Sequence, residues 1–346
     1  MTQAIVLSKM LISNGHEIVH TFIGKSDRRS TPAYFFDQLD SEISELRSPN
    51  FILDKNNKSL KLGKSISHNA RFLSTYKKSL YSIHQKVKET SPDAIVNFYD
   101  FLGGFYFRFY NPSNVRHICI GRQFLTLHPD YPFAPKRDIE KRLYLGNNRI
   151  TSQKCDKYFA LSFRPYAPCD IKKLVVAPPL IHANTSDEII QGDFILAYMV
   201  NDGYAEEIIS WHSQNPEVEV HCFWDRKNMP ITHCPQPNLT FHQIDNLRFK
   251  EMMKRCAGYI STAGFESICE AMQLQKPAMM IPVKGQYEQA CNAIDAEQSG
   301  AGISSDTFDI SKLIAYLPNY RPNPGFMAWL DQAESIFIEE LTNFNQ

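Results

Sequence analysis

The segment from residue 258 to residue 293, GYISTAGFESICEAMQLQKPAMMIPVKGQYEQACNA, carries the residues best suited to chemistry. Its opening GYIS predicts a short strand, residues 262–264 predict a turn of small residues, and a helix begins near Phe265. The N-terminus of a helix presents unpaired N–H groups and the positive end of the helix dipole. Because Gly264 also lets a ligand approach the backbone closely, the segment predicts a place where a diphosphate can bind.

The predicted helix after this turn has an apolar face and a separate acidic face. The apolar face repeats at i, i+3, i+4 and i+7 and consists of Phe265, Ile268, Cys269 and Met272. Glu266 and Glu270 are four residues apart and lie on another face. The next strand ends at Pro282, and the loop after it, KGQYEQACNA, is rich in amide side chains, which suit sugar hydroxyls. An ordinary βα turn would explain the glycine and the acids alone, whereas the amide-rich loop favours a ligand site.

Strand-like and helix-like segments alternate along the chain, which is typical of parallel α/β sheets. In the first half, strand-like runs such as HEIVHTFIG and KLVVAPP are separated by helix-compatible segments. Two prolines end the last of these strands, and the polar stretch that follows predicts a linker near 180–192. We therefore expect two facing, doubly wound α/β domains, residues 1–180 and 190–322. A C-terminal amphipathic helix should occupy residues 323–346.

Composition limits the possible functions. Hydrophobic residues make up 43% of the chain and charged residues 21%, as in a packed globular protein. Lys plus Arg and Asp plus Glu both number 37, so the zero net charge gives no general attraction to nucleic acid or to anionic membranes. No apolar run approaches the roughly 20 residues that span a bilayer. The eight cysteines include no CxxC pair, which argues against a zinc site or a disulfide framework and favours reduced thiols in the cytoplasm.

The spacing within this segment resembles the nucleotide-sugar-binding half of the two-domain glycosyltransferases of family 28. That group includes the bacterial enzyme that adds N-acetylglucosamine to the lipid-linked peptidoglycan precursor. Gly264, Glu270 and Pro277 match the family's glycine, glutamate and proline. The pairs EQ at 288–289 and NA at 292–293 match its Gln-Gln and Asn-Ala pairs. Most of the chain is also similar to uncharacterised bacterial proteins of this kind, which share NGHEIV, GYAEE and TAGFESICEAM. The resemblance implies the GT-B architecture of two facing Rossmann-like domains.

The resemblance also implies a donor site in the C-terminal domain. Glu270 would hold the ribose hydroxyls, the turn at Gly264 would face the diphosphate, and Gln289 would touch the donor sugar. Glu288 stands where the family has its first glutamine, which leaves the identity of the sugar open. Loops after the first and third strands of this domain would add contacts, although an Asx turn explains the first of them equally well. The residues assigned to donor binding are Thr262, Gly264, Phe265, Glu266, Glu270, Gln286, Glu288, Gln289, Asn292, Asn201, Gly203 and Ile244.

The beginning of the chain predicts a helix before any strand. TQAIVLSKMLISNG forms a complete helical pattern with Thr2 as a cap and Gly15 as its stop, and HEIVHTFIG follows as a strand. A doubly wound sheet normally starts with a strand. In the proteins that this chain resembles, a strand and a GxGRGH-like loop come first, and the resemblance implies that the loop histidine is the general base. We therefore expect roughly 10–15 residues to be absent ahead of Met1, and the N-terminal sheet to lack a central strand. A chain without that base should transfer no sugar.

Two segments of the N-terminal half could serve an acceptor. Residues 97–112, NFYDFLGGFYFRFYNP, are rich in aromatic residues. They predict either a buried strand that runs into a helix or an apolar surface for a lipid-linked acceptor and peripheral membrane contact. The stretch GRQFLTLHPDY could line an acceptor cleft. Its His128 is a candidate catalytic residue, although a lone histidine is more often structural.

We predict a glycosyltransferase that uses a nucleotide sugar, a UDP-sugar by the resemblance, and an unknown lipid-linked or cell-envelope acceptor. It would act in the cytoplasm, at the inner face of the membrane, and its reaction scheme requires no metal and no cofactor. In relatives the last helix crosses back to the N-terminal domain, which presents the acceptor. Two alternatives stay open. One is a non-hydrolysing sugar-nucleotide epimerase, which shares the architecture, and the other is an inactive protein that binds a nucleotide sugar.

Overall fold

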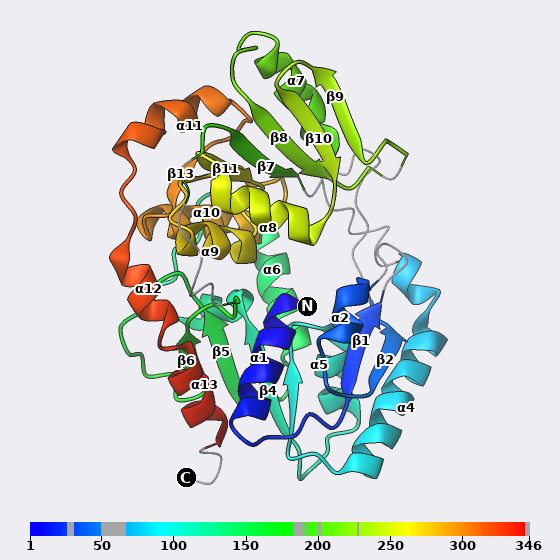
Figure 1. Ribbon diagram of the computed structural model, residues 1–346. Coiled ribbons are helices and arrows are strands. Elements are labelled where there is room, and N and C mark those ends of the chain that lie inside the picture. Colours follow the sequence, from blue (N-terminus) through cyan, green and yellow to red (C-terminus); the bar gives the residue numbers. More distant parts are fainter. Residues whose placement is uncertain are drawn as a thin grey trace.

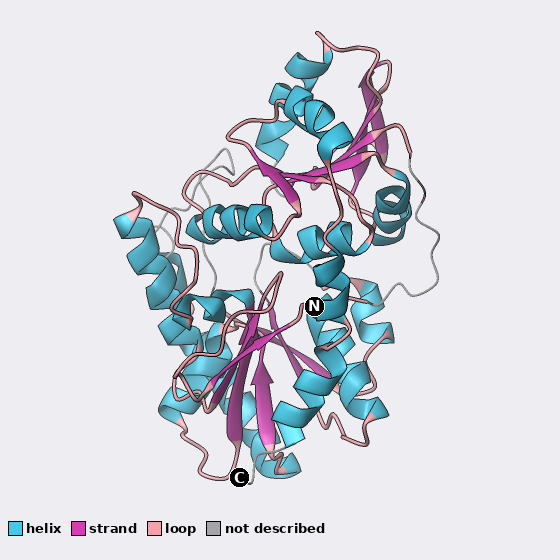
Figure 2. Ribbon diagram, turned by 90° about the vertical axis from the view of Figure 1, so that its left-hand side faces the viewer, coloured by secondary structure: helices cyan, strands magenta, loops and turns pink. Residues whose placement is uncertain are grey.

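The computed structural model describes residues 1–25, 31–49, 67–182, 190, 192–199, 202–226 and 228–342. Two α/β domains lie one above the other, with the N-terminal domain below and the C-terminal domain above (Figure 1). Helices cover both faces of each domain's strands (Figure 2). Most of the predicted linker lies outside the described residues.

The strands of the N-terminal domain are divided into two parallel sheets. One contains β1 (Thr21–Lys25) and β2 (Ile43–Arg47). The other has the order β3 (Ala94–Asn97), β4 (Arg116–Gly121), β5 (Lys157–Leu161) and β6 (Leu174–Ala177). Among the described residues, no strand joins β1 to β3. The upstream strand and loop expected from the sequence stay a prediction.

Helices hold these two sheets together. On one face, α1 (Thr2–Ser13) packs Ile5 with Ile23 of β1, and Leu7 joins the core that contains Ile118 of β4. On the other face, Phe22 of β1 and Ile95 of β3 pack against one cluster formed by α4 (Leu73–Thr90) and α5 (Phe101–Phe109). The domain therefore depends on side-chain packing where a sheet would use strand pairing. Its other helical elements are α2 (Ala33–Asp37), the 3₁₀ helix η1 (Arg122–Leu127) and α6 (Asp138–Thr151).

The ends of α1 differ in part from the prediction. Thr2 is the first residue inside the helix, and Met1 is the N-cap, so Thr2 does not cap the helix as predicted. Gly15 has a φ of 82°, in the left-handed region that glycine adopts readily, and its N–H donates to the carbonyl of Ile12. The helix therefore stops at the predicted glycine.

In the described part of the C-terminal domain, seven strands form one continuous sheet. Six are parallel, and both faces of its central strands are buried, as is usual for parallel sheets. The strand order is β13 (Gly302–Ser304), β12 (Ala278–Met280), β11 (Gly258–Ser261), β7 (Ile195–Met199), β8 (Val220–Trp224), β10 (Leu239–Gln243) and β9 (Thr232–Gln236). Helical elements between the strands include η2 (Asp202–Tyr204), α7 (Ala205–His212), α8 (Asn246–Arg255), α9 (Phe265–Gln273) and α10 (Tyr287–Gln298), and α11 (Ile310–Tyr316) and η3 (Leu317–Asn319) follow β13.

The sequence does not predict β9, because Pro235 lies within it. β9 is the outermost strand and pairs antiparallel with β10, and its register shifts between Leu239 and Phe241. An edge strand with such an irregularity tolerates a proline, which cannot donate to the ladder. The antiparallel edge is therefore a feature that the alternating pattern could not reveal.

The end of the chain forms two helices instead of the single helix predicted. α12 (Pro324–Leu330) and α13 (Ala333–Thr342) are separated at Asp331. α12 contacts α9 of the C-terminal domain, whereas α13 lies on the N-terminal domain (Figure 1). There the rings of Phe337 and Phe159 stack with centroids 4.9 Å apart, and Lys157 Nζ pairs with Glu340 Oε2 at 2.7 Å. The terminal segment thus connects both domains.

Candidate active site

The strand order of the C-terminal sheet shows where a ligand can bind. From β7 the chain builds outward to β8 and β10, and it then returns to place β11 on the other side of β7. Ligands of open parallel sheets bind beyond the carboxyl ends of the strands at such a switch point. The loops that meet there carry Gly203 after β7, and Ala263 and Gly264 after β11.

The turn after β11 has an unusual backbone. Ala263 has a φ of 56°, a left-handed conformation that costs an L-residue about 1–2 kcal/mol. Gly264 is the N-cap of α9 and supplies no side-chain cap, which leaves the N–H groups of the first helical turn for a ligand. A Cβ on Gly264 would meet only Ser267 Oγ within 4 Å, at 3.7 Å. Packing within the protein therefore does not demand this glycine, and its absent side chain leaves open space beside the helix end.

Glu270 lies one helical turn beyond Glu266 on α9. Burial raises the pKa of Glu270 to about 7, with the charge of Glu266 adding to the rise and Lys250 of α8 opposing it. At neutral pH the carboxyl group can therefore accept or donate hydrogen bonds, which suits a pair of neighbouring hydroxyls.

Two basic residues at this site were missed by the sequence analysis. His182 follows β6, and burial lowers its pKa, as do the charges of Lys250 and of Lys9 on α1. Lys250 also acts on Glu270, so one lysine lies within electrostatic range of both groups. No spacing rule links these two positions, because they come from the domain connection and from α8.

The predicted residues of α10 point in three directions: toward the N-terminal domain, toward the loop before the helix and toward the turn. Gln123 Nε2 of η1 donates to Glu288 Oε1 at 2.9 Å, and loss of solvent raises the pKa of Glu288 despite this bond. Gln289 instead points back, and its Oε1 accepts from the N–H of Val283 at 2.8 Å. Asn292 is buried and donates to the carbonyl of Ala263 at 3.3 Å. In this structure the side chain of Gln289 therefore stabilises the loop before α10.

A buried group of side chains, here called the interdomain ion cluster, joins the domains beside the turn. It consists of Arg122, Arg164, Tyr166 and Asp295. Arg122 Nη2 donates to Asp295 Oδ2 at 2.5 Å, and Tyr166 Oη donates to Asp295 Oδ1 at 2.8 Å. Burial alone would lower the pKa of Arg122, but the Asp295 carboxylate raises it, so the guanidinium stays charged.

The structure brings most of the predicted donor residues to one edge of the sheet. Thr262 is buried under the turn, and Phe265 is buried with its ring centroid 4.7 Å from that of Phe163 in the N-terminal domain. Gln286 is the N-cap of α10. Ile244 follows β10 and is 44% exposed. Asn201 lies outside the described residues.

His128 is buried and held by two hydrogen bonds. Its Nε2 donates to the carbonyl of Ala167 at 2.8 Å, and its Nδ1 accepts from the N–H of Asp130 at 3.1 Å. Both ring nitrogens are therefore engaged, which is typical of a structural histidine and leaves none for proton transfer from an acceptor.

The aromatic segment 97–112 continues from the end of β3 into α5. Phe101, Phe105 and Phe109 follow one another along this helix, with successive ring centroids 6.3 and 6.1 Å apart. Phe109 is 69% exposed, whereas Tyr106 and Phe107 are buried. The segment therefore combines a core face with an outward aromatic row.

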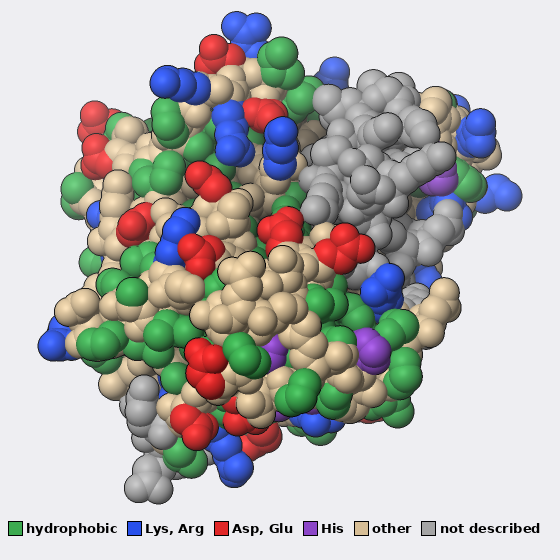
Figure 3. Space-filling model, turned by 90° about the horizontal axis from the view of Figure 1, so that it is seen from above, with side chains coloured by type: hydrophobic (Ala, Val, Ile, Leu, Met, Phe, Trp, Pro, Cys, Tyr) green, Lys and Arg blue, Asp and Glu red, His purple; other side chains and the backbone are tan. Residues whose placement is uncertain are grey.

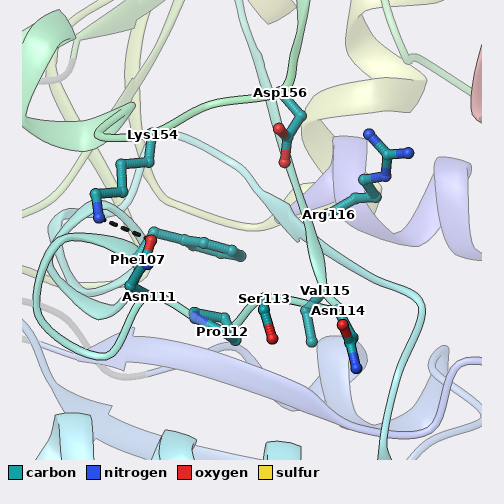
Figure 4. A pocket seen from close by; sticks show the side chains of 9 residues that line it. All are labelled: Phe107, Asn111, Pro112, Ser113, Asn114, Val115, Arg116, Lys154 and Asp156. Atoms are coloured by element: carbon teal, nitrogen blue, oxygen red, sulfur yellow. Dashed lines mark hydrogen bonds between the residues drawn. The ribbon is translucent and has the colours of Figure 1, made fainter.

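A cavity of about 570 Å³ lies away from the switch point, at the amino ends of β4 and β5 (Figure 4). Arg116, Lys154 and Asp156 line it, and Lys154 Nζ donates to Asn111 Oδ1 at 2.7 Å. Ligands of parallel sheets bind at the opposite, carboxyl edge. We therefore place the active site at the switch point, although this cavity is large.

Cationic and anionic side chains are interspersed on the face of the C-terminal domain seen from above (Figure 3). Within the described ranges, no helix combines the length and the hydropathy needed to cross a bilayer.

The chain matches a known protein family in sequence and known glycosyltransferases in fold. The model of the family described as "Glycosyl transferase family 1" matches residues 3–319. The glycotransferase of kitacinnamycin superposes with a TM-score of 0.60 at 14% identity, covering 97% of this chain and 91% of that chain. Arabidopsis thaliana UGT89C1, solved with UDP-L-rhamnose, gives 0.61 at 12% identity, covering 99% and 94%. Phytolacca americana UGT2, solved with UDP-2fluoro-glucose and pterostilbene, gives 0.63 at 11% identity, covering 100% and 96%. No curated protein matches the sequence.

These superpositions show that the two Rossmann-like domains have the GT-B architecture. The family match covers most of the chain, and the protein belongs to glycosyl transferase family 1. The predicted fold class and the predicted enzyme class are both confirmed.

Proposed function

We propose that this glycosyltransferase transfers a sugar from a UDP-sugar to an acceptor presented by the N-terminal domain. The observation that carries the proposal is the glycine-capped start of α9 at the switch point, with Glu270 one and a half turns along the helix. The A. thaliana and P. americana structures hold UDP-sugars, which supports UDP as the nucleotide.

Different groups of the protein would bind the diphosphate, the ribose and the base of the proposed donor. The N–H groups of the first turn of α9 would receive the diphosphate and stabilise the charge that develops on it as the sugar leaves. Glu270 would bind the ribose hydroxyls, and the main chain at Ile244 would border the base. The acceptor oxygen forms the new bond at the anomeric carbon, the bond to the diphosphate breaks, and a base takes the acceptor proton.

The direct experiment is a thermal-shift screen of nucleotide sugars followed by a transfer assay. A ligand that binds the native state raises the midpoint of unfolding by mass action. We expect UDP and at least one UDP-sugar to raise it, and ADP- and GDP-sugars to have little effect. A screen in which no uridine nucleotide raises the midpoint would overturn the proposal.

The two alternatives give different products. An epimerase would convert the nucleotide sugar with no acceptor present, which chromatography of the sugar product detects. An inactive binding protein would bind UDP in calorimetry and yield neither hydrolysis nor transfer with any acceptor extract.

Two finer features belong to this proposal. The first is likeness to the family 28 peptidoglycan enzymes, which the matches at Gly264, Glu270 and Pro277 support and which would favour a lipid-linked acceptor. The second is a cytoplasmic location at the inner face of the membrane, which fractionation would test.

A further inference from the structure

One buried side chain connects the interdomain ion cluster to the turn before Gly264. Asn292 of α10 is 1% exposed. Its Nδ2 donates to the carbonyl of Ala263 at 3.3 Å, and its Oδ1 accepts from Arg122 Nε of the N-terminal domain at 3.2 Å. Ala263 is the residue with the left-handed φ of 56°. A contact from the opposite domain thus reaches the strained residue that aims the start of α9.

We propose that Arg122 is a positioning residue for the donor diphosphate. It orients the amide of Asn292, and that amide fixes the Ala263–Gly264 turn so that the first N–H groups of α9 point at the phosphates. This inference rests on the proposed function, because it assumes that the diphosphate lies at this turn. Arg122 itself acts through Asn292 and needs no contact with the donor.

The geometry at Arg122 requires a guanidinium. Nη1 donates to the carbonyl of Leu161 at 3.3 Å, Nη2 donates to Asp295, and Nε donates to Asn292. These three donors lie in one rigid plane, whereas a lysine offers a single ammonium that cannot serve all three acceptors at once. The Nε bond therefore sets the direction of the Asn292 amide.

A contribution to the free energy of unfolding explains the buried Arg122–Asp295 pair less well than a positioning role does. Arg122 and Asp295 are 2% and 0% exposed, and a buried ion pair often stabilises a fold no more than apolar packing of the same size would. A strained backbone persists where its surroundings hold it, and such strain is common at binding sites. Here the amide of Asn292 supplies that restraint, and the opposite domain orients the amide.

The positioning role of Arg122 predicts a loss of binding affinity that is larger for ligands that carry phosphates. In the full chain, Arg122→Lys keeps a positive charge beside Asp295 but loses the directed Nε bond. We expect it to weaken UDP binding about tenfold, as for one lost hydrogen bond of this kind, and to change uridine binding less than twofold. Calorimetry or NMR titration well below the unfolding midpoint measures both, because uridine keeps the ribose and base contacts without a diphosphate.

Arg164→Lys is the matched control, since Arg164 also pairs with Asp295, at 3.1 Å, and is 36% exposed. It should leave both affinities within twofold. Asn292→Asp tests the bond from the Asn292 amide to Ala263, because it retains an acceptor for Arg122 but cannot donate to the Ala263 carbonyl. It should lower the affinity for UDP more than the affinity for uridine. If Arg122→Lys does not fold, the affinities of Asn292→Asp for UDP and for uridine test the positioning role in its place.

The outcomes separate this inference from the proposed function. If UDP and uridine weaken together, or if the Arg164 control behaves like Arg122→Lys, the positioning role is overturned while UDP binding stands. If the unchanged protein binds no UDP, the proposed function fails and this inference falls with it.

Discussion

Among the residues that the structure describes, the C-terminal domain joins seven strands in one continuous sheet, whereas the N-terminal domain has six strands divided into a pair and a set of four. Their central strands differ accordingly. All residues of β11 are buried, and those of β7 nearly so, whereas β1 and β3 keep most of their residues partly exposed. The donor side is thus complete as a sheet, while the acceptor side depends on helices α1, α4 and α5 to hold two pieces together.

This difference teaches that the two halves of the active site are built by different means. On the donor side, strand pairing fixes the loops after β7 and β11. On the acceptor side, the interdomain ion cluster and α13 tie the four-stranded sheet to the rest, and the β1–β2 pair relies on apolar packing. The following predictions test that contrast, from the largest expected effect to the smallest.

The largest expected difference between the sheets of the two domains is in their rates of amide hydrogen exchange. Amides of β7 and β11 should exchange on the order of a thousandfold more slowly than the slowest amides of β1, because the complete sheet opens only on global unfolding. Exchange read out by mass spectrometry or NMR measures this difference. Equal protection of β1 and β11 would show that another segment pairs with the inner edge of β1.

Removal of the central carboxylate should destabilise the junction of the domains. Asp295→Ala leaves Arg122 and Arg164 without their common partner, and we expect a loss of about 3–5 kcal/mol in the free energy of unfolding. Urea denaturation measures it, with exposed Asp306→Ala as the control. A loss under about 1 kcal/mol, the range of a surface pair, would mean that the cluster does not join the domains.

The contact of α13 with the N-terminal domain should also be substantial. Phe337 is fully buried against Phe159, so Phe337→Ala should cost about 3–5 kcal/mol. Phe109→Ala makes the same chemical change at a 69% exposed site and should stay within about 0.5 kcal/mol. If both variants unfold at the same urea concentration, the terminal helix does not anchor this domain.

On the donor side, Glu270→Ala should weaken UDP binding by about 1–3 kcal/mol, as expected when a charged hydrogen-bond partner is removed. The exposed Glu217 provides a control of the same chemistry at a distance from the turn. Calorimetry with UDP gives both values, and an unchanged affinity in Glu270→Ala would sink the assignment of the ribose site.

The pKa of Glu270 predicts a pH dependence that Glu270→Gln removes. The folded-state pKa of about 7 lies above the ordinary 4.5, so this carboxyl lowers stability progressively as pH rises from about 4.5 to 7. Ribose hydroxyls donate best to the ionised form, so uridine affinity should rise about tenfold between pH 6 and pH 8. Uridine is the suitable probe because it has no phosphate that titrates there. A flat profile in the unchanged protein would contradict this role.

Some parts of the candidate site can be predicted from patterns of consecutive residues. The turn at 262–264 and the apolar face of α9 follow from the sequence, because small residues, a helical period and a buried strand are properties of consecutive residues. Alternation of strands and helices likewise predicts the doubly wound fold. β9 escaped prediction, since Pro235 argues against a strand and only its place at the sheet edge permits one.

The sequence by itself determined the class of fold and the class of enzyme, and it predicts the turn where the donor should bind. Only the tertiary structure decided which side chains face that turn. Arg122 meets Asp295 across 173 positions of sequence, and His182 lies near Lys250 only because the domains dock. The types of these residues give no sign of their partners. Periodicity arises from hydrogen bonds between near neighbours in the chain, whereas ion pairs and domain contacts depend on how whole elements pack.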